Sequence, residues 1–241
     1  MAAVSGSTDT PDQSAPAVTG FGRLYEAIAG AELLRLCRGQ RVLDLGHGAP
    51  GVTTWVASQS AASVAIVDRT RCDDETLDPE DLAPASAFDV AYALRTFAHL
   101  GRDDESSVNQ ATRLLHGLSA SLAPGGLGVI EIANPTSLRG VLEGVRNPVT
   151  VVRQAPRRHF VFSDEFRLTR YDTLSRLFGM LPPDLRAVQV TGIGILSPSD
   201  RVHDIPVLRG MLSRVERRLS SADPLRRFGA FLLVTLRKVT G

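Results

Sequence analysis

Residues 41–51, Arg-Val-Leu-Asp-Leu-Gly-His-Gly-Ala-Pro-Gly, decide the fold of this chain. An apolar run that contains Asp44 leads into a glycine-rich loop, and the segment 52–62 after the loop has the composition of a helix. A second apolar run then ends in Asp68. Strand, glycine loop, helix and strand with a terminal carboxylate is the order of a nucleotide-binding βαβ unit. Such a carboxylate can accept both hydroxyls of a ribose, so the pattern predicts what is bound but not which molecule is changed.

Two details of this unit limit the classes of ligand that it can bind. The separation of Gly46 and Asp68 suits one crossover, close to the roughly 20 residues of a dinucleotide-binding fold. Asp44 lies two residues before the first glycine, where a carboxylate is unfavourable beside an anionic pyrophosphate but suits a cationic ammonium or sulfonium group. The segment Gly46–Gly51 also satisfies the pattern GxGxxG, so an NAD-type oxidoreductase is one alternative.

The stretch Val-Leu-Asp-Leu-Gly-His-Gly resembles the first motif of the class I S-adenosylmethionine (SAM) methyltransferases, roughly V-L-D-x-G-x-G-x-G. Here Gly51 stands one position later than the family's usual third glycine. Two further segments carry the resemblance: Phe-Asp-Val at 88–90, continued by Ala98-His99-Leu100, and Leu122-Ala-Pro-Gly-Gly before an apolar strand. The resemblance covers about 41–134 by motifs and 186–238 by pattern.

The resemblance implies an α/β fold with a Rossmann-like seven-stranded mixed sheet and an antiparallel final strand pair. The third strand is expected to be short or absent, because residues 69–87 are polar, acidic and interrupted by two prolines. Residues 1–20 are predicted to form a disordered tail, and residues 21–241 one methyltransferase domain with a cap insertion over about 136–182.

Hydrophobic periodicity predicts the remaining elements. Helices are expected over 21–36, 105–122 and 204–221, and strands over 41–45, 63–68, 88–94, 127–133, 186–196 and 229–238. Alternation in the segment 159–172 indicates a small hairpin, and Asp172 is the expected N-cap of a helix that follows.

The resemblance also assigns roles. The residues expected to bind the cofactor SAM are Asp44, Gly46, His47, Gly48, Gly51, Asp68, Asp81 and Leu94. Asp68 is expected at the ribose, Asp44 near the ammonium and Asp81-Leu82 at the adenine. Tyr25 falls where the family often has an aromatic residue over the cofactor. The structural alternatives are that Asp68 caps a turn, that Asp44 shapes the loop and that Tyr25 is ordinary helix packing.

His99 is the candidate catalytic residue. It follows the 88–94 strand at the mouth of the expected site, and imidazole titrates near neutrality, as a general base for a hydroxyl or amine acceptor requires. Local packing is the alternative. No histidine, cysteine and carboxylate set has metal-ligand spacing, so no metal is expected.

Composition limits the partners. The 27 basic and 26 acidic side chains give a net charge of +1, which favours neither a nucleic acid nor a membrane partner. Arginines gather late in the chain, and we interpret them as solvated faces or as an entrance for an anionic substrate; they include Arg153, Arg157, Arg158, Arg167, Arg170, Arg214, Arg217, Arg218, Arg226 and Arg227. Cys37 and Cys72 are expected to be free thiols, so a cytoplasmic protein is predicted.

The sequence therefore predicts a SAM-dependent methyltransferase for a small-molecule acceptor, with O-methylation slightly favoured by the histidine. The main alternative is a methyltransferase-fold protein that binds SAM or a related ligand without transferring methyl, as a cyclisation catalyst or a binding partner. The sequence leaves the acceptor and the oligomeric state open.

Overall fold

The computed structural model describes residues 21–46, 60–74, 76, 78–138, 160–163, 167–196 and 206–239. Its centre is a six-stranded sheet with the order β2-β1-β3-β4-β8-β7. The strands are β1 (Arg41–Leu45), β2 (Ser63–Val67), β3 (Phe88–Ala93), β4 (Leu122–Ala133), β7 (Leu185–Ile193) and β8 (Phe231–Lys238). Strands β1 to β4 run parallel to one another, whereas β8 runs antiparallel to both β4 and β7. The predicted mixed sheet with an antiparallel end is confirmed.

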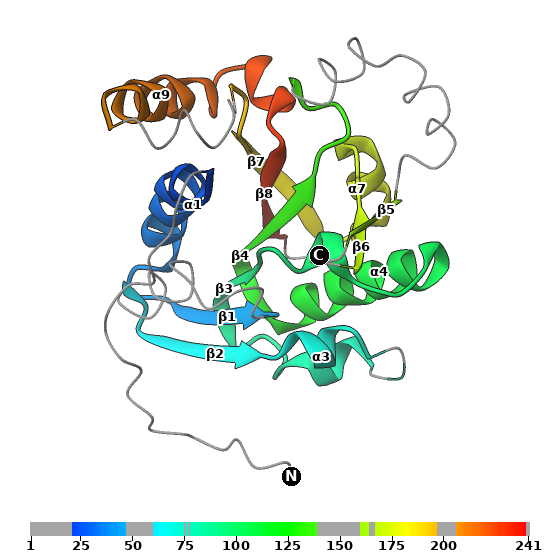
Figure 1. Cartoon of the computed structure of the whole chain (residues 1–241). Coiled ribbons are helices and arrows are strands. Elements are labelled where there is room, and N and C mark those ends of the chain that lie inside the picture. The colour runs from blue at the N-terminus through cyan, green and yellow to red at the C-terminus, as the bar shows by residue number, and fades with distance from the viewer. Residues whose placement is uncertain are drawn as a thin grey trace.

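Helices cover both faces of this sheet, as Figure 1 shows for α1 (Phe21–Cys37) and α4 (Asp104–Ser121). Buried residues form two apolar clusters, one that contains α1 side chains and one that contains α4 side chains. Alternate residues of β1 enter different clusters: Val42 packs with α1 and Leu43 with α4. Since successive strand side chains point to opposite faces, the apolar residues of β1 serve both sides of the sheet.

Both main helices begin and end close to the predicted residues. At α4 the Asp103 carboxylate accepts the Ser106 N–H at 2.8 Å, and the Ser106 hydroxyl accepts the Asp103 N–H at 3.1 Å. This reciprocal arrangement satisfies two N–H groups that the first helical turn leaves without partners. Helix α9 (Pro206–Leu219) lies beside α1 in Figure 1 and agrees with the predicted 204–221 helix.

The link between β2 and β3 is short. Among its described residues it contains the one-turn helix α3 (Arg69–Cys72) and the 3-10 helix η1 (Pro79–Leu82), and no strand. The predicted loss of the third strand is therefore confirmed for this part of the chain. The prolines and the scarcity of β-branched residues explain it, because the segment has too little apolar surface for a buried strand.

The predicted hairpin is confirmed as the antiparallel pair β5 (Phe160–Ser163) and β6 (Arg167–Arg170). The predicted cap of the next helix, α7 (Leu174–Met180), is wrong. Thr173 is the N-cap, and its hydroxyl accepts the Arg176 N–H at 3.3 Å. The Asp172 side chain is instead buried against Arg170, with 2.7 Å between Oδ2 and Nε.

The interpretation of the late arginines as solvated is wrong for Arg170. This side chain has no exposed surface, and its guanidinium donates to the Ser107 carbonyl at 2.5 Å and to the Phe97 carbonyl at 3.2 Å. Burial lowers the pKa of Arg170, and the Asp172 charge opposes that change. This buried cation ties the hairpin to α4 and to the loop after β3.

The predicted tail over 1–20 and the predicted helix over 52–62, apart from its last residues, lie outside the described residues. No helix within the described ranges is long and apolar enough to cross a membrane.

Candidate functional site

Asp44 lies next to the carboxyl end of β1, where only 2% of its surface is exposed. It pairs in register with Tyr92 of β3, whose hydroxyl donates to Asp44 Oδ2 at 3.1 Å. A carboxylate so close to the end of a central strand is costly to bury and needs donors around it. The arrangement places a negative charge immediately before the glycine loop.

Gly46 begins that loop with a φ of +91°, a backbone conformation that favours glycine. Its N–H donates to the Val67 carbonyl at 2.7 Å, and its carbonyl accepts the Thr96 hydroxyl at 2.5 Å. A Cβ on Gly46 would lie 2.5 Å from Thr96 Cγ2. The Thr96 hydroxyl also lies 3.1 Å from the carbonyl of Leu94, which is itself buried, so Thr96 joins the ends of β1 and β3.

Asp68 follows β2 at the same edge of the sheet and is exposed. Its Oδ1 accepts both the N–H and the hydroxyl of Thr70 at 2.7 Å, and its carbonyl accepts the Arg71 and Cys72 N–H groups. Asp68 thus starts α3, and the structural alternative of a turn cap is confirmed. Its role at a ribose stays a prediction.

Asp81 is exposed in η1, and its carbonyl accepts an Arg71 guanidinium N–H at 3.2 Å. Its neighbour Leu82 is buried in the cluster that contains α4 and would touch a Cβ placed on Gly117. Leu82, the apolar residue of the predicted adenine contact, therefore packs against α4.

His99 closes the 3-10 helix η2 (Phe97–His99) after β3 and is 7% exposed. Its Nδ1 lies 3.2 Å from the Thr169 hydroxyl of β6. Because Thr169 precedes the buried Arg170, the hairpin fixes one side of the imidazole. The sequence indicated His99 but had no signal for Thr169, which is 70 residues away.

A second polar group beside this edge consists of the buried pair Tyr25 and Glu131 and the exposed Arg95. The Tyr25 hydroxyl donates to the Glu131 carboxylate, and both residues are almost fully buried. The Arg95 guanidinium carbon lies 5.4 Å from the centre of the Tyr25 ring. Burial raises the pKa of Glu131, an effect that the Tyr25 hydrogen bond and the Arg95 charge oppose. Burial and the nearby Glu131 charge raise the pKa of Tyr25 well above its usual value.

The remaining predicted loop residues, His47, Gly48 and Gly51, lie outside the described residues. No group of three or more histidine, cysteine or carboxylate side chains that could hold a metal occurs in the described ranges.

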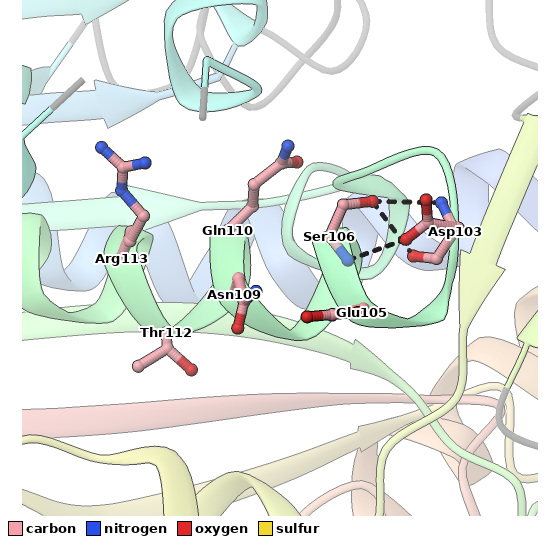
Figure 2. A pocket seen from close by; sticks show the side chains of 7 residues that line it. All are labelled: Asp103, Glu105, Ser106, Asn109, Gln110, Thr112 and Arg113. Carbon is pink, nitrogen blue, oxygen red and sulfur yellow. Dashed lines mark hydrogen bonds between the residues drawn. The ribbon is translucent and has the colours of Figure 1, made fainter. Parts of the chain in front are cut away.

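A shallow depression along the outer side of α4 does not belong to this site (Figure 2). Its lining is polar and consists of Asp103, Glu105, Ser106, Asn109, Gln110, Thr112 and Arg113. Asp103 and Ser106 are joined to one another as the helix cap, and the Ser106 N–H and hydroxyl lower the pKa of Asp103. These groups serve the helix, so the carboxyl edge of β1, β2 and β3 is the better candidate.

Comparison with solved structures places this edge in a known architecture. A SAM-dependent methyltransferase from Mesorhizobium loti aligns over 91% of this chain and all of its own, with 17% identity and a TM-score of 0.52. The fold is that of the class I SAM-dependent methyltransferases. The [4+2]-cyclase SpnF shares this methyltransferase fold over 90% of the present chain and 81% of its own, with 14% identity and a TM-score of 0.52.

A third structure aligns less closely. The 1,6-didemethyltoxoflavin-N1-methyltransferase of Burkholderia thailandensis covers 89% of this chain and 79% of its own, with 16% identity and a TM-score of 0.48. Comparison of the sequence with protein-family models and with curated proteins gave no match.

Proposed function

We propose that this protein is a SAM-dependent methyltransferase that acts on a small-molecule acceptor. The observation that carries the proposal is the meeting of Asp44, Gly46 and Asp68 at one edge of a methyltransferase-fold sheet. The Gly46 N–H reaches the last residue of β2, next to Asp68, so the strand ends that carry the two carboxylates are held together. Two carboxylates flanking a glycine loop fit a ligand that has a cationic amino acid part and a ribose.

In this proposal Asp68 binds the ribose hydroxyls and Asp44 faces the ammonium group, directly or through water. Gly46, His47, Gly48 and Gly51 line the path of the methionine part, Leu94 borders it and Asp81 reaches the adenine. SAM supplies a methyl group already activated on a sulfonium, so the protein's main task is to align the acceptor with it.

His99 is proposed as the base when the acceptor is a hydroxyl, because Thr169 orients its ring and β3 delivers it to the site edge. Once an acceptor is found, His99→Asn should lower kcat by about 10² to 10⁴. Thr169→Val, which removes only the orienting hydroxyl, should cause a smaller loss. An unchanged pH–rate profile in His99→Asn would remove the histidine from the chemistry.

The first experiment is calorimetric titration with SAM, with its demethylated product S-adenosylhomocysteine (SAH) and with NAD. We expect both sulfur nucleotides to bind and NAD to give no heat. Asp68→Asn keeps an oxygen for the Thr70 cap but loses the charge, and should weaken binding at least about tenfold, or 1.4 kcal/mol.

Asp74→Asn is the matched control. Asp74 Oδ1 accepts the N–H of Thr76 at 2.8 Å and its hydroxyl at 2.7 Å, which is the same turn as at Asp68 but not at a strand end. It should bind SAH like the wild type. A folded protein that binds neither sulfur nucleotide would refute the proposal, and binding of NAD instead would favour the oxidoreductase.

The alternative function, a methyltransferase-fold protein that transfers no methyl, is favoured by the link between β2 and β3, whose described residues contain no strand. Two results together would support this alternative. SAH would bind in a way that depends on Asp68, and the protein would convert a substrate without consuming SAM.

A cytoplasmic location is also proposed. It is supported by the two described cysteines, Cys37 and Cys72, which are free thiols.

A further inference from the structure

Arg95 has an unusual backbone. Its φ is +53°, and Ser86 is the other described non-glycine residue with a positive value. A side chain with a Cβ disfavours this region, and residues held there concentrate at functional sites. Arg95 directly follows Leu94, which lies just past the carboxyl end of β3, beside the strand that carries Asp44.

The neighbours of Arg95 hold it in this conformation. On one side, the Thr96 hydroxyl bonds to the carbonyls of Gly46 and Leu94, which locks the turn. On the other side, the Glu131 carboxyl lies close enough for both the charge and the backbone amide of Arg95 to lower its pKa against the larger effect of burial. The conformation is thus determined by the site itself.

The Tyr25 ring positions the guanidinium of Arg95, which lies over its face. The ring is fixed at its hydroxyl by Glu131 and at its edge by Phe231, with ring centres 6.3 Å apart and planes at 89°. Arginine stacked on an aromatic face keeps its N–H groups available in the plane of the guanidinium. The buried Tyr25–Glu131 pair therefore acts as a platform for an exposed cation.

Carboxylates of the described chain do not form an ion pair with this guanidinium within 4 Å. Glu26 feels its charge, yet burial raises the pKa of Glu26 by more than Arg95 and Arg23 lower it. Arg35, an exposed arginine of α1, provides a contrast, since it donates to Glu32 at 2.6 Å.

We propose that Arg95 binds an anionic group of the acceptor, a carboxylate or a phosphate, and so selects for acidic small molecules. A guanidinium matches the two oxygens of either group with two parallel N–H donors. The inference rests on the proposed function, since it assigns the acceptor side of the same site. Arg95 is a specificity residue here, and Tyr25 and Glu131 position it.

The test is calorimetric titration of SAH-loaded protein with benzoate, phenyl phosphate and the neutral benzamide, at constant ionic strength. We expect at least one anion to bind at least tenfold more tightly than benzamide, and the preferred anion to distinguish a carboxylate from a phosphoryl acceptor. R95Q and R95G should each weaken that binding at least tenfold, while SAH affinity stays within twofold of the wild type.

R95G keeps the test interpretable, because glycine suits the positive φ and the variant should unfold at the wild-type temperature or above. R35Q removes the same charge from α1 and should bind the anions as the wild type does. Absence of binding by both anions, or equal binding by R95Q and wild type, would overturn the inference while leaving SAH binding intact. Loss of SAH binding by the wild-type protein would instead refute the proposed function.

Discussion

Gly46 and Gly39 both require a positive φ, but their surroundings differ. Both have positive φ, but a Cβ on Gly39 would meet nothing within 4 Å, whereas one on Gly46 would meet Thr96. Gly39→Ala should therefore cost about 1 kcal/mol of unfolding free energy, from backbone strain alone.

For Gly46→Ala we expect about 2 to 4 kcal/mol, because a clash with a short β-branched side chain adds to the strain. Urea unfolding of both variants measures the difference. The same loss in both would show that Thr96 moves aside and that the loop is less constrained than its contacts indicate.

Glu131 makes stability depend on pH in a predictable direction. Burial raises its pKa above the ordinary value of 4.5, so the folded state holds the proton more tightly than the unfolded state. Its contribution is complete below pH 4.5 and is lost as the pH rises through the folded-state pKa. Glu131→Gln keeps an acceptor for Tyr25, and its stability relative to wild type should rise with pH by at most about 1.4 kcal/mol per unit.

Asp89 provides a comparison of opposite sign. The hydrogen bonds from Arg41 lower its pKa, so its contribution is lost as the pH falls. The stability of Asp89→Asn relative to wild type should therefore increase toward acid. Unfolding free energies from pH 3 to 8 give both trends, because the Asp89 contribution is lost below the ordinary pKa of 3.8. A flat Glu131→Gln difference would mean that its carboxyl is not perturbed.

At the residue scale the sequence predicts only part of the site. Asp44 lies within one apolar run and Asp68 ends the next, so both are visible in the pattern, as is His99 after its strand. Thr96 and Glu131 are not, because their importance comes from contacts with residues 50 and 106 positions away. Asp172 misled the prediction, since it resembles a helix cap in sequence but neutralises a buried arginine in space.

Among the elements, the hairpin β5–β6 depends on the buried Arg170–Asp172 pair. Arg170→Met removes the cation and leaves Asp172 buried, so we expect a loss of about 3 to 5 kcal/mol. The double variant Arg170→Met/Asp172→Asn should recover part of it, because no charge then stays buried. Arg41→Met, which breaks an exposed pair with Asp89, should change stability little.

Denaturant unfolding of these variants, as a double-mutant cycle, checks the coupling. A double variant as unstable as Arg170→Met would show that the hydrogen bonds to Ser107 and Phe97, rather than the charge, secure the hairpin.

Most elements could be predicted because periodicity is a local property. The helices α1, α4 and α9 and the strands of the main sheet lie within a few residues of their predicted bounds. The exact start of β4 could not be predicted, since Pro124 and two glycines look like a turn yet belong to the strand. The pairing of Leu122 with Phe88 of β3, across a register shift that no local pattern encodes, extends β4 beyond Leu127, where its pairing with β8 begins.

At the scale of the whole molecule, two buried cysteines can show separately whether each face of the sheet has unfolded. Cys37 lies in the cluster with α1 and Cys72 in the cluster with α4. Burial, and then the charge of Asp44, raise the pKa of each thiol to about 12. Since the thiolate is the reactive form, neither should react with a thiol reagent while the protein is folded.

If one sheet unites both clusters into a single cooperative unit, Cys37→Ser and Cys72→Ser should expose their remaining thiols at the same urea concentration, relative to each variant's own unfolding midpoint. Labelling with a chromogenic disulfide reagent through the transition measures this. SAH should delay labelling of both thiols together, because a ligand that binds only the folded state stabilises it by about 2.7 kcal/mol at a hundred times its Kd. Earlier labelling of Cys72 would mean that the shortened segment between β2 and β3 opens before the sheet, and that the loss of the third strand has made this face a separate unit.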